Sequence, residues 1–244
     1  MLLGESFRFG GQGTRSRGED VSYPEQINAC KTHLKFIEAL KTRGCHMDIS
    51  ISTYTTKFNN DLINMYKDYL INANFYDNCI GIHNLFHSNL KNIHTDKYDF
   101  IIYIRIDLFL KDKFIDIFNP SWETIRFPCI CFLPHCIVEG HPRVNSMLLF
   151  IPKKYYQYIG NMNFLPVGDD GHRLWAHLVN EVKLTYTDLN TMIDTFHDSD
   201  SAKDYNPLYY IVNRKQQTIF HSEGNVFDKY NLSITGKSFI TPRW

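Results

Sequence analysis

The feature that most constrains the fold is a long apolar run near the middle of the chain. It reads Tyr98-Asp-Phe-Ile-Ile-Tyr-Ile-Arg-Ile-Asp-Leu-Phe-Leu and spans residues 98–110. A run that stays apolar instead of alternating is typical of a strand buried on both faces at the centre of an α/β sheet. We therefore expect a layered protein in which helices cover such a sheet.

The segments around this run alternate between strand and helix patterns. The clearest are strands over 1–9 and 47–54 and helices over 23–43 and 58–72, with further strands over 124–133, 144–151 and 209–212. Pro24 and Glu25 suit the first turn of a helix, and Gly44 suits its end. The alternation predicts one α/β domain over 1–244, with a Rossmann-like mixed sheet flanked by helices.

The composition of the chain limits the kinds of molecule that it is expected to bind. The chain has 244 residues, and its 26 Lys and Arg balance its 26 Asp and Glu. A net charge of zero argues against a general nucleic-acid binder, because such proteins need a basic excess. No segment reaches the ~18 consecutive apolar residues of a membrane span. The first residues also lack the pattern of a signal peptide, so we expect a cytoplasmic protein.

The end of the apolar run carries the first candidate site. Arg105 and Asp107 interrupt the run near its carboxyl end. In open α/β sheets ligands bind outside the carboxyl ends of the strands. Charged groups there are costly unless they face a ligand, a metal or a partner. The alternative is that the two side chains share one strand face and pair with each other.

A second candidate site is the sequence Gly168-Asp-Asp-Gly-His before a predicted helix. Asp169, Asp170 and His172 are suited to deprotonating a hydroxyl or holding a metal. Acids in a first helical turn also act as caps with no catalytic role. Two acids and a histidine exceed what a cap needs, so we interpret the cluster as catalytic.

Two loops supply candidate phosphate contacts. The glycine-rich segment from Gly4 to Gly18 carries Arg8, Arg15 and Arg17, and glycine amides with arginines suit a diphosphate. The polar loop 197–207 contains Lys203, which can meet a phosphate, although a solvated turn explains this loop as well. Thr53 and Tyr54, at the end of the second strand, offer polar and flat contacts to a donor.

Several motifs together resemble a group of small GT-A-like glycosyltransferases of large DNA viruses that infect algae and protists. The motifs span most of the chain: Leu-Leu-Gly-Glu-Ser-Phe-Arg at the start, Thr53-Tyr54, the run 98–108, Phe-Ile-Pro-Lys-Lys-Tyr-Tyr, Gly-His before a Trp-containing helix, and Asp-Ser-Asp-Ser-Ala-Lys-Asp-Tyr-Asn-Pro.

The resemblance implies an N-terminal half that binds a nucleotide sugar, such as a UDP-sugar, and a C-terminal half that faces a glycan acceptor. In GT-A enzymes an Asp-x-Asp motif holds Mn²⁺ or Mg²⁺ against the donor diphosphate. The equivalent position here reads Arg105-Ile106-Asp107. Asp107 is then expected to bind the metal or the donor ribose, and Arg105 offers a direct charge for the diphosphate. Asp170 matches the base of inverting members, with Asp169 as second choice.

Two other functions remain open at this point. Gly10-Gly-Gln-Gly-Thr-Arg15 is similar to the loop of sugar-nucleotide nucleotidyltransferases, but the Pro-Lys expected after its arginine is missing. A non-catalytic glycan-binding relative is the other alternative, since Arg105 replaces the first acid of the metal motif. The Asp169–Asp170 pair argues against a pure binding protein, which has little use for a clustered base.

Overall fold

The computed structural model describes residues 1–10, 15–127, 130–131, 137–138, 141–144, 147–160, 190–191 and 208–213. The chain forms two compact units, each built from separate segments. One contains 1–93, 104–120 and 196–223, and the other contains 94–103, 121–195 and 224–244. The expected α/β class is confirmed. The expectation of a single domain over 1–244 stays a prediction.

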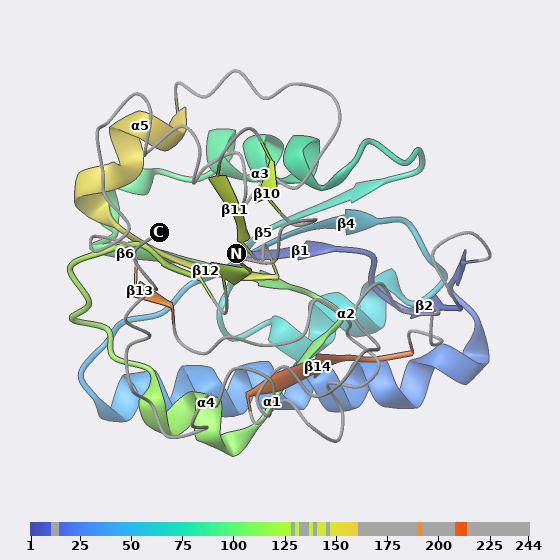
Figure 1. Ribbon diagram of the computed structural model, residues 1–244. Coiled ribbons are helices and arrows are strands. Elements are labelled where there is room, and N and C mark those ends of the chain that lie inside the picture. The colour runs from blue at the N-terminus through green and yellow to red at the C-terminus, as the bar shows by residue number, and fades with distance from the viewer. Residues whose placement is uncertain are drawn as a thin grey trace, which may run out of the picture. The chain divides into compact units, whose positions relative to one another are not determined.

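The first unit is built on parallel strands. Strand β1 (Leu2–Gly4) lies between β4 (Ile49–Tyr54) and the end of β6 (Phe100–Arg105), and β5 (Leu70–Tyr76) follows β4. Helices α1 (Tyr23–Thr42) and α2 (Asn59–Tyr66) cover one face, and α3 (Ile82–Lys91) covers the other (Figure 1). Because the chain winds outward from β1 to β5 and then returns to β1's other side, this is a doubly wound, Rossmann-like arrangement.

Smaller elements complete this unit. A hairpin of β2 (Arg8–Phe9) and β3 (Ser16–Arg17) follows β1, and a 3₁₀ turn over Asp20–Ser22 leads into α1. After β6, strand β7 (Leu108–Leu110) pairs antiparallel with β14 (Tyr209–Ile211), and α4 (Asp112–Ile117) follows. The hairpin therefore stands directly after the carboxyl end of β1.

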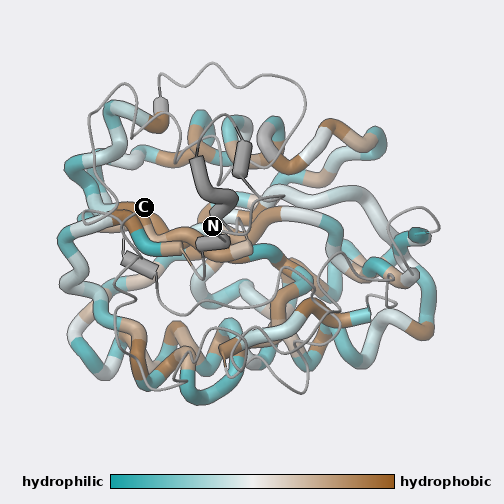
Figure 2. The backbone as a smooth tube through the Cα atoms, in the orientation of Figure 1, coloured by the Kyte–Doolittle hydropathy of each residue, from teal (hydrophilic) through white to brown (hydrophobic). Residues whose placement is uncertain are grey.

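Helix α1 forms where the sequence predicts it. Pro24 occupies the first turn, where its missing N–H costs nothing, and Glu25 supports the same turn. One face of the helix is buried, and Figure 2 shows its tube alternating between hydrophobic and hydrophilic segments. Phe36 on that face contacts Phe114 and Phe118, with ring centroids 5.1 and 4.9 Å away. These aromatic contacts fix α1 against α4.

His33 on α1 is a buried polar residue that joins three elements. Its Nδ1 lies 2.7 Å from the Tyr66 hydroxyl of α2, and its Nε2 lies 2.6 Å from the Leu108 carbonyl oxygen of β7. A carbonyl oxygen only accepts, so Nε2 carries the proton and Nδ1 accepts from Tyr66. Burial lowers the pKa of His33 from 6.5 to about 4. The ring is therefore neutral in the folded protein at neutral pH.

Because His33 is buried in its neutral form, we expect the folded protein to lose stability in acid. The unfolded chain takes up the proton first as pH falls, because its pKa is the higher one. The stabilisation is therefore fully present above about pH 6.5 and is lost towards about pH 4, by at most roughly 3 kcal/mol. Urea unfolding at about pH 7.5 and about pH 4.5 measures the loss. The His33→Gln variant should lose less stability than the parent between these two pH values. An equal loss in both proteins would show that His33 is not the cause.

The second unit contains shorter strands. In it β12 (Leu148–Pro152) pairs antiparallel with β8 (Arg126–Phe127), and β13 (Asn190–Thr191) pairs parallel with β8, so the sheet is mixed. The remaining elements are β9 (Ile130–Cys131), β10 (Ile137–Val138), β11 (His141–Val144), α5 (Tyr156–Gly160), and 3₁₀ turns over Thr95–Lys97 and Lys153–Tyr155. Phe150 packs against Phe100 and Trp122. No helix among the described residues is both long and apolar enough to cross a membrane.

Three sequence-based expectations were wrong in detail. The strand expected over 1–9 ends at Gly4, because Phe7 takes a positive φ and Arg8–Phe9 pairs with β3 instead. The run 98–110 is not one strand, because the chain leaves the sheet after Arg105 and β7 pairs with β14 instead. The expected helix over 58–72 ends at Tyr66, and β5 begins at Leu70. In β5, amides at Asn72 and Asn74 alternate with less polar residues, and this two-residue period pairs with β4.

Candidate functional site

The topology places the candidate site at the carboxyl ends of β1 and β6. The chain moves from β1 to β4 and β5 on one side, and β6 lies on the other side of β1. In doubly wound folds ligands bind where the direction of strand order reverses. Leu3 of β1 is aligned with Arg105 of β6, and the Ile106 N–H donates to the Leu3 carbonyl oxygen at 2.8 Å. The predicted residues Gly4 and Arg105 thus end neighbouring strands.

The end of β1 is held by a buried threonine. Thr53 Oγ1 donates to the Gly4 carbonyl oxygen at 2.8 Å and accepts from the Ser6 N–H at 3.1 Å. Gly4 has φ +119°, a conformation that residues with a Cβ rarely adopt. Thr53 is fully buried. Its observed contacts are with the loop after β1, and its predicted contact with a donor stays a prediction.

The loop after β1 is clamped to α1 through Phe7. This residue has φ 50°, unusual for a residue with a Cβ, and is fully buried against Tyr23 and Phe58. Its N–H donates to Gln26 Oε1 at 3.0 Å, and its carbonyl accepts from Ser22 Oγ at 2.9 Å. The Phe7 carbonyl also accepts from the Gly18 N–H at 2.9 Å, so Phe7 is held by α1, by the 3₁₀ turn before it and by the segment after β3.

Gln26 also reaches the loop after β6. Its Nε2 donates to the Ile106 carbonyl oxygen at 2.7 Å, while its Oε1 holds Phe7. The side chain is fully buried. One amide thus fixes the two loops that border the topological switch point relative to each other. Sequence reasoning missed this residue, because a glutamine at a core-facing helix position carries no local signal of its two partners.

We expect Gln26→Leu to destabilise the protein by about 2–3 kcal/mol. Leucine has similar volume but leaves the Phe7 N–H and the Ile106 carbonyl oxygen without their buried partner. Chemical denaturation measures the loss. Gln26→Glu, which keeps an acceptor for Phe7 but has no N–H for Ile106, separates the two bonds. A Gln26→Leu variant as stable as the parent would contradict the role given to this side chain.

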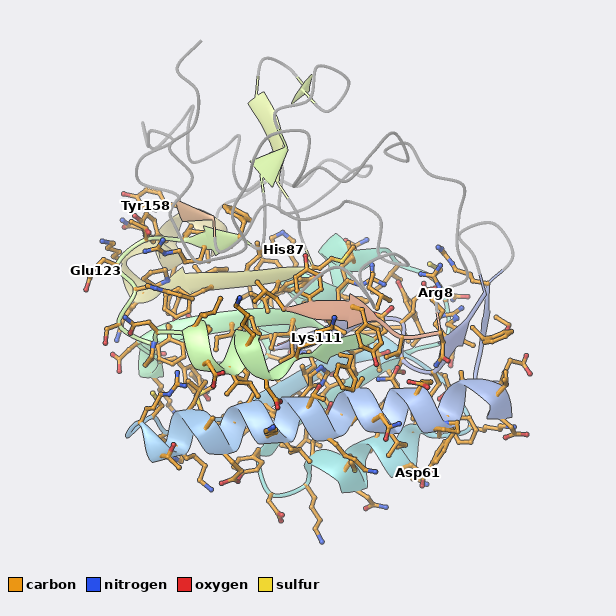
Figure 3. The ribbon with its side chains drawn as sticks, turned by 60° about the horizontal axis from the view of Figure 1, so that its bottom comes forward. Arg8, Asp61, His87, Lys111, Glu123 and Tyr158 are labelled. Atoms are coloured by element: carbon orange, nitrogen blue, oxygen red, sulfur yellow. The ribbon has the colours of Figure 1, made fainter. Side chains whose placement is uncertain are left out.

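Three arginines and one glutamate gather in the loop and hairpin after β1. Glu5 Oε2 lies 3.3 Å from Arg8 Nη1, and Glu5 Oε1 lies 3.1 Å from Arg15 Nε. Arg8 stands directly opposite Arg17 in the β2–β3 hairpin. Figure 3 shows Arg8 beside the N-terminal end of α1. Arg8 and Arg15, both predicted donor contacts, therefore share one carboxylate.

Tyr54 joins this group from β4. The guanidinium carbon of Arg17 lies 4.4 Å from the centre of the Tyr54 ring, a cation–π contact. The Tyr54 hydroxyl oxygen accepts from the Gly81 N–H at 3.1 Å. Burial, followed by the contact with Cys79, raises the pKa of Tyr54 well above its usual value. This phenol therefore stays protonated at neutral pH, and its ring orients Arg17.

Arg105 and Asp107 form the pair that the sequence analysis left open. Arg105 Nε donates to Asp107 Oδ1 at 2.9 Å, and Arg105 Nη2 donates to Asp107 Oδ2 at 2.7 Å. Asp107 is fully buried, and the Arg105 side chain is 20% exposed. The Asp107 carbonyl oxygen accepts from the Val212 N–H at 2.9 Å. A bidentate pair of this kind holds both carboxylate oxygens of Asp107.

The described residues do not fit the expected metal site. No three His, Cys, Asp or Glu residues converge in the part of the chain that the structure describes. Asp107, the expected ligand, has both oxygens on Arg105. Binding of Mn²⁺ or Mg²⁺ stays a prediction. The predicted residues Asp169, Asp170, His172 and Lys203 also lie outside them.

Comparisons with known proteins identify no family for the chain. No protein-family model matches it, and no curated protein matches it either. Among solved structures it is similar to HddC from Yersinia pseudotuberculosis, at 16% sequence identity and a TM-score of 0.38, over 64% of this chain and 77% of that one. A likeness of this size carries no functional argument. The resemblance to viral glycosyltransferases therefore rests on sequence motifs alone.

Proposed function

We propose that the protein is a glycosyltransferase that moves a sugar from a nucleoside-diphosphate sugar to a hydroxyl of a glycan acceptor. The observation that carries the proposal is the position of the arginine group. Arg8, Arg15 and Arg17 lie directly after β1, which is where doubly wound folds bind phosphorylated ligands. Cations there suit a donor diphosphate, which is the leaving group of glycosyl transfer.

The proposed chemistry needs one base and one stabilised leaving group. The acceptor oxygen bonds to the anomeric carbon while the bond from that carbon to the diphosphate oxygen breaks, and the diphosphate leaves with the electron pair. Asp170, supported by Asp169 and His172, takes the proton of the acceptor hydroxyl. A single base acting on the acceptor predicts inversion at the anomeric carbon. Of the groups in this mechanism, the arginines after β1 lie among the residues that the structure describes.

A donor panel tests the proposal. UDP-, GDP- and CDP-sugars are incubated with the protein, with and without Mn²⁺, and release of the nucleoside diphosphate is measured. A glycosyltransferase slowly hydrolyses its donor even without an acceptor. Release from one donor class, lost in Asp170→Asn, is the expected result. No release from any donor, with or without glycan acceptors, would count against transfer and favour the glycan-binding alternative.

A nucleotidyltransferase is the second candidate. Gly10 to Arg15 resembles the phosphate loop of that class, and Arg15 stands after β1 in contact with Glu5. This chemistry joins a nucleoside triphosphate to a sugar phosphate and releases pyrophosphate. Pyrophosphate release from such a pair, with no cleavage of nucleotide sugars, would replace the glycosyltransferase proposal by this one.

A further inference from the structure

The β2–β3 hairpin brings like charges together. Arg8 and Arg17 are direct cross-strand partners in an antiparallel pair. Side chains in such positions leave the same face of the hairpin with their Cβ atoms ~5 Å apart, and like charges there destabilise the pair. Arg15 precedes β3 by one residue. A hairpin stabilised only for folding has no reason to carry three arginines on so short a segment.

Glu5 supplies the negative charge within this group. It contacts Arg8 through one carboxylate oxygen and Arg15 through the other. With one carboxylate for three guanidinium groups, the group carries a formal excess of two positive charges. Arg17 forms no ion pair with any residue in the described ranges, and its Nη1 is buried without a hydrogen-bond partner. A buried N–H donor without an acceptor is costly, so an additional acceptor is expected there.

The exposures divide the three arginines into two kinds. The Arg15 side chain is 37% exposed and Arg17 is half-buried, so both can touch a ligand. The Arg8 side chain is only 3% exposed. Its charge acts from the interior, where low solvent access strengthens an electrostatic attraction. Tyr54 holds the Arg17 guanidinium in place from β4. The group therefore combines two partly exposed arginines, held by Glu5 and Tyr54, with one buried arginine.

We propose that Arg15 and Arg17, backed by Arg8, bind the diphosphate directly and without a divalent ion, and that Glu5 is the counter-ion that the diphosphate displaces. This inference rests on the proposed function for the identity of the ligand. A diphosphate carries negative charge and offers acceptor oxygens to Arg15 and to Arg17, whose Nη1 has no other acceptor among the described residues. The alternative metal ligand Asp107 is held by Arg105 through both oxygens. The arginines thus replace the metal in neutralising the leaving group.

Inorganic pyrophosphate and UDP, titrated calorimetrically in EDTA, test the inference. The wild-type protein should bind pyrophosphate in EDTA, and added Mn²⁺ should not tighten binding. Arg17→Gln should weaken binding roughly 10- to 100-fold, because it removes a charge-assisted donor. Glu5→Gln should tighten it roughly 5-fold, because the competing carboxylate is gone. The control Lys35→Gln removes an exposed cation paired with Asp112 and should change nothing.

Tighter binding by Glu5→Gln cannot result from misfolding, since an unfolded variant does not bind more tightly. Pyrophosphate binding that requires Mn²⁺, or equal affinity in wild type and Arg17→Gln, would overturn the inference. Arginine-dependent pyrophosphate binding without cleavage of any nucleotide sugar keeps the inference and removes the proposed function. Donor cleavage that requires Mn²⁺ and is unchanged in Arg17→Gln would keep the proposed function and remove this inference.

Discussion

An Asp170→Asn variant is expected to bind the nucleotide-sugar donor like the parent and to lose transfer by roughly 10²- to 10⁴-fold. Asparagine has the shape of aspartate but cannot take a proton from the acceptor hydroxyl. The change removes the proposed base and leaves the proposed donor contacts after β1 as they are. Initial rates of nucleoside-diphosphate release with acceptor measure the loss, and thermal shift with the donor shows whether binding survives.

Asp169→Asn is the matched control for that variant. It alters the neighbouring carboxylate in the same sequence and should reduce the rate less if Asp170 is the base. Full activity in Asp170→Asn would move the base elsewhere. A loss of donor binding together with activity would instead assign Asp170 to the donor site.

The second large effect is on stability. Arg105→Gln should destabilise the protein by roughly 3–5 kcal/mol, because it leaves the fully buried Asp107 carboxylate without its bidentate partner. Urea or guanidinium unfolding at neutral pH measures the effect. A change under about 1 kcal/mol would be typical of an exposed ion pair, and would show that Asp107 has another partner of equal strength.

The double variant Arg105→Met/Asp107→Leu separates the pair's structural role from its predicted binding role. Replacing a buried ion pair by apolar residues of similar size is often neutral or stabilising, so this protein should regain much of the lost stability. If Arg105 or Asp107 contacts the donor as the sequence predicts, the double variant stays folded and binds the donor less well. Unchanged affinity would leave the pair with a structural role only.

The architecture of the first unit was largely predictable from local patterns. Pro24 and the apolar stripe define α1, and β4 ends at Tyr54 as the sequence places it, whereas the first strand ends at Gly4 and not at residue 9. The break after Arg105 was not predictable, because it depends on contacts of the following residues with Gln26, with Val212 and with the β14 strand. These partners are distant in sequence, so the local hydrophobic pattern carries no information about them.

The candidate site was predictable in its residue types but not in its pairings. The sequence indicated arginines after β1 and a charged pair at the end of β6, and the fold brings both to neighbouring strand ends. It did not indicate that Glu5 bridges two of those arginines or that Arg17 stacks on Tyr54. Nor did it indicate that Arg105 bonds both carboxylate oxygens of Asp107. These pairings are the basis for proposing a cationic diphosphate site, and they follow only from three-dimensional register.

Hydrogen exchange with bound nucleotide tests whether the β1–β6 switch point holds the donor. UDP, GDP, ADP and CDP are first ranked by thermal shift, and the strongest is added at saturation while amide exchange is followed by mass spectrometry. We expect slower exchange in two peptides at once, one covering the loop after β1 (residues 4–10) and one covering the β6–β7 turn (residues 104–110). No thermal shift with any nucleotide, or protection confined to other segments, would contradict a nucleotide-sugar site at the β1–β6 switch point.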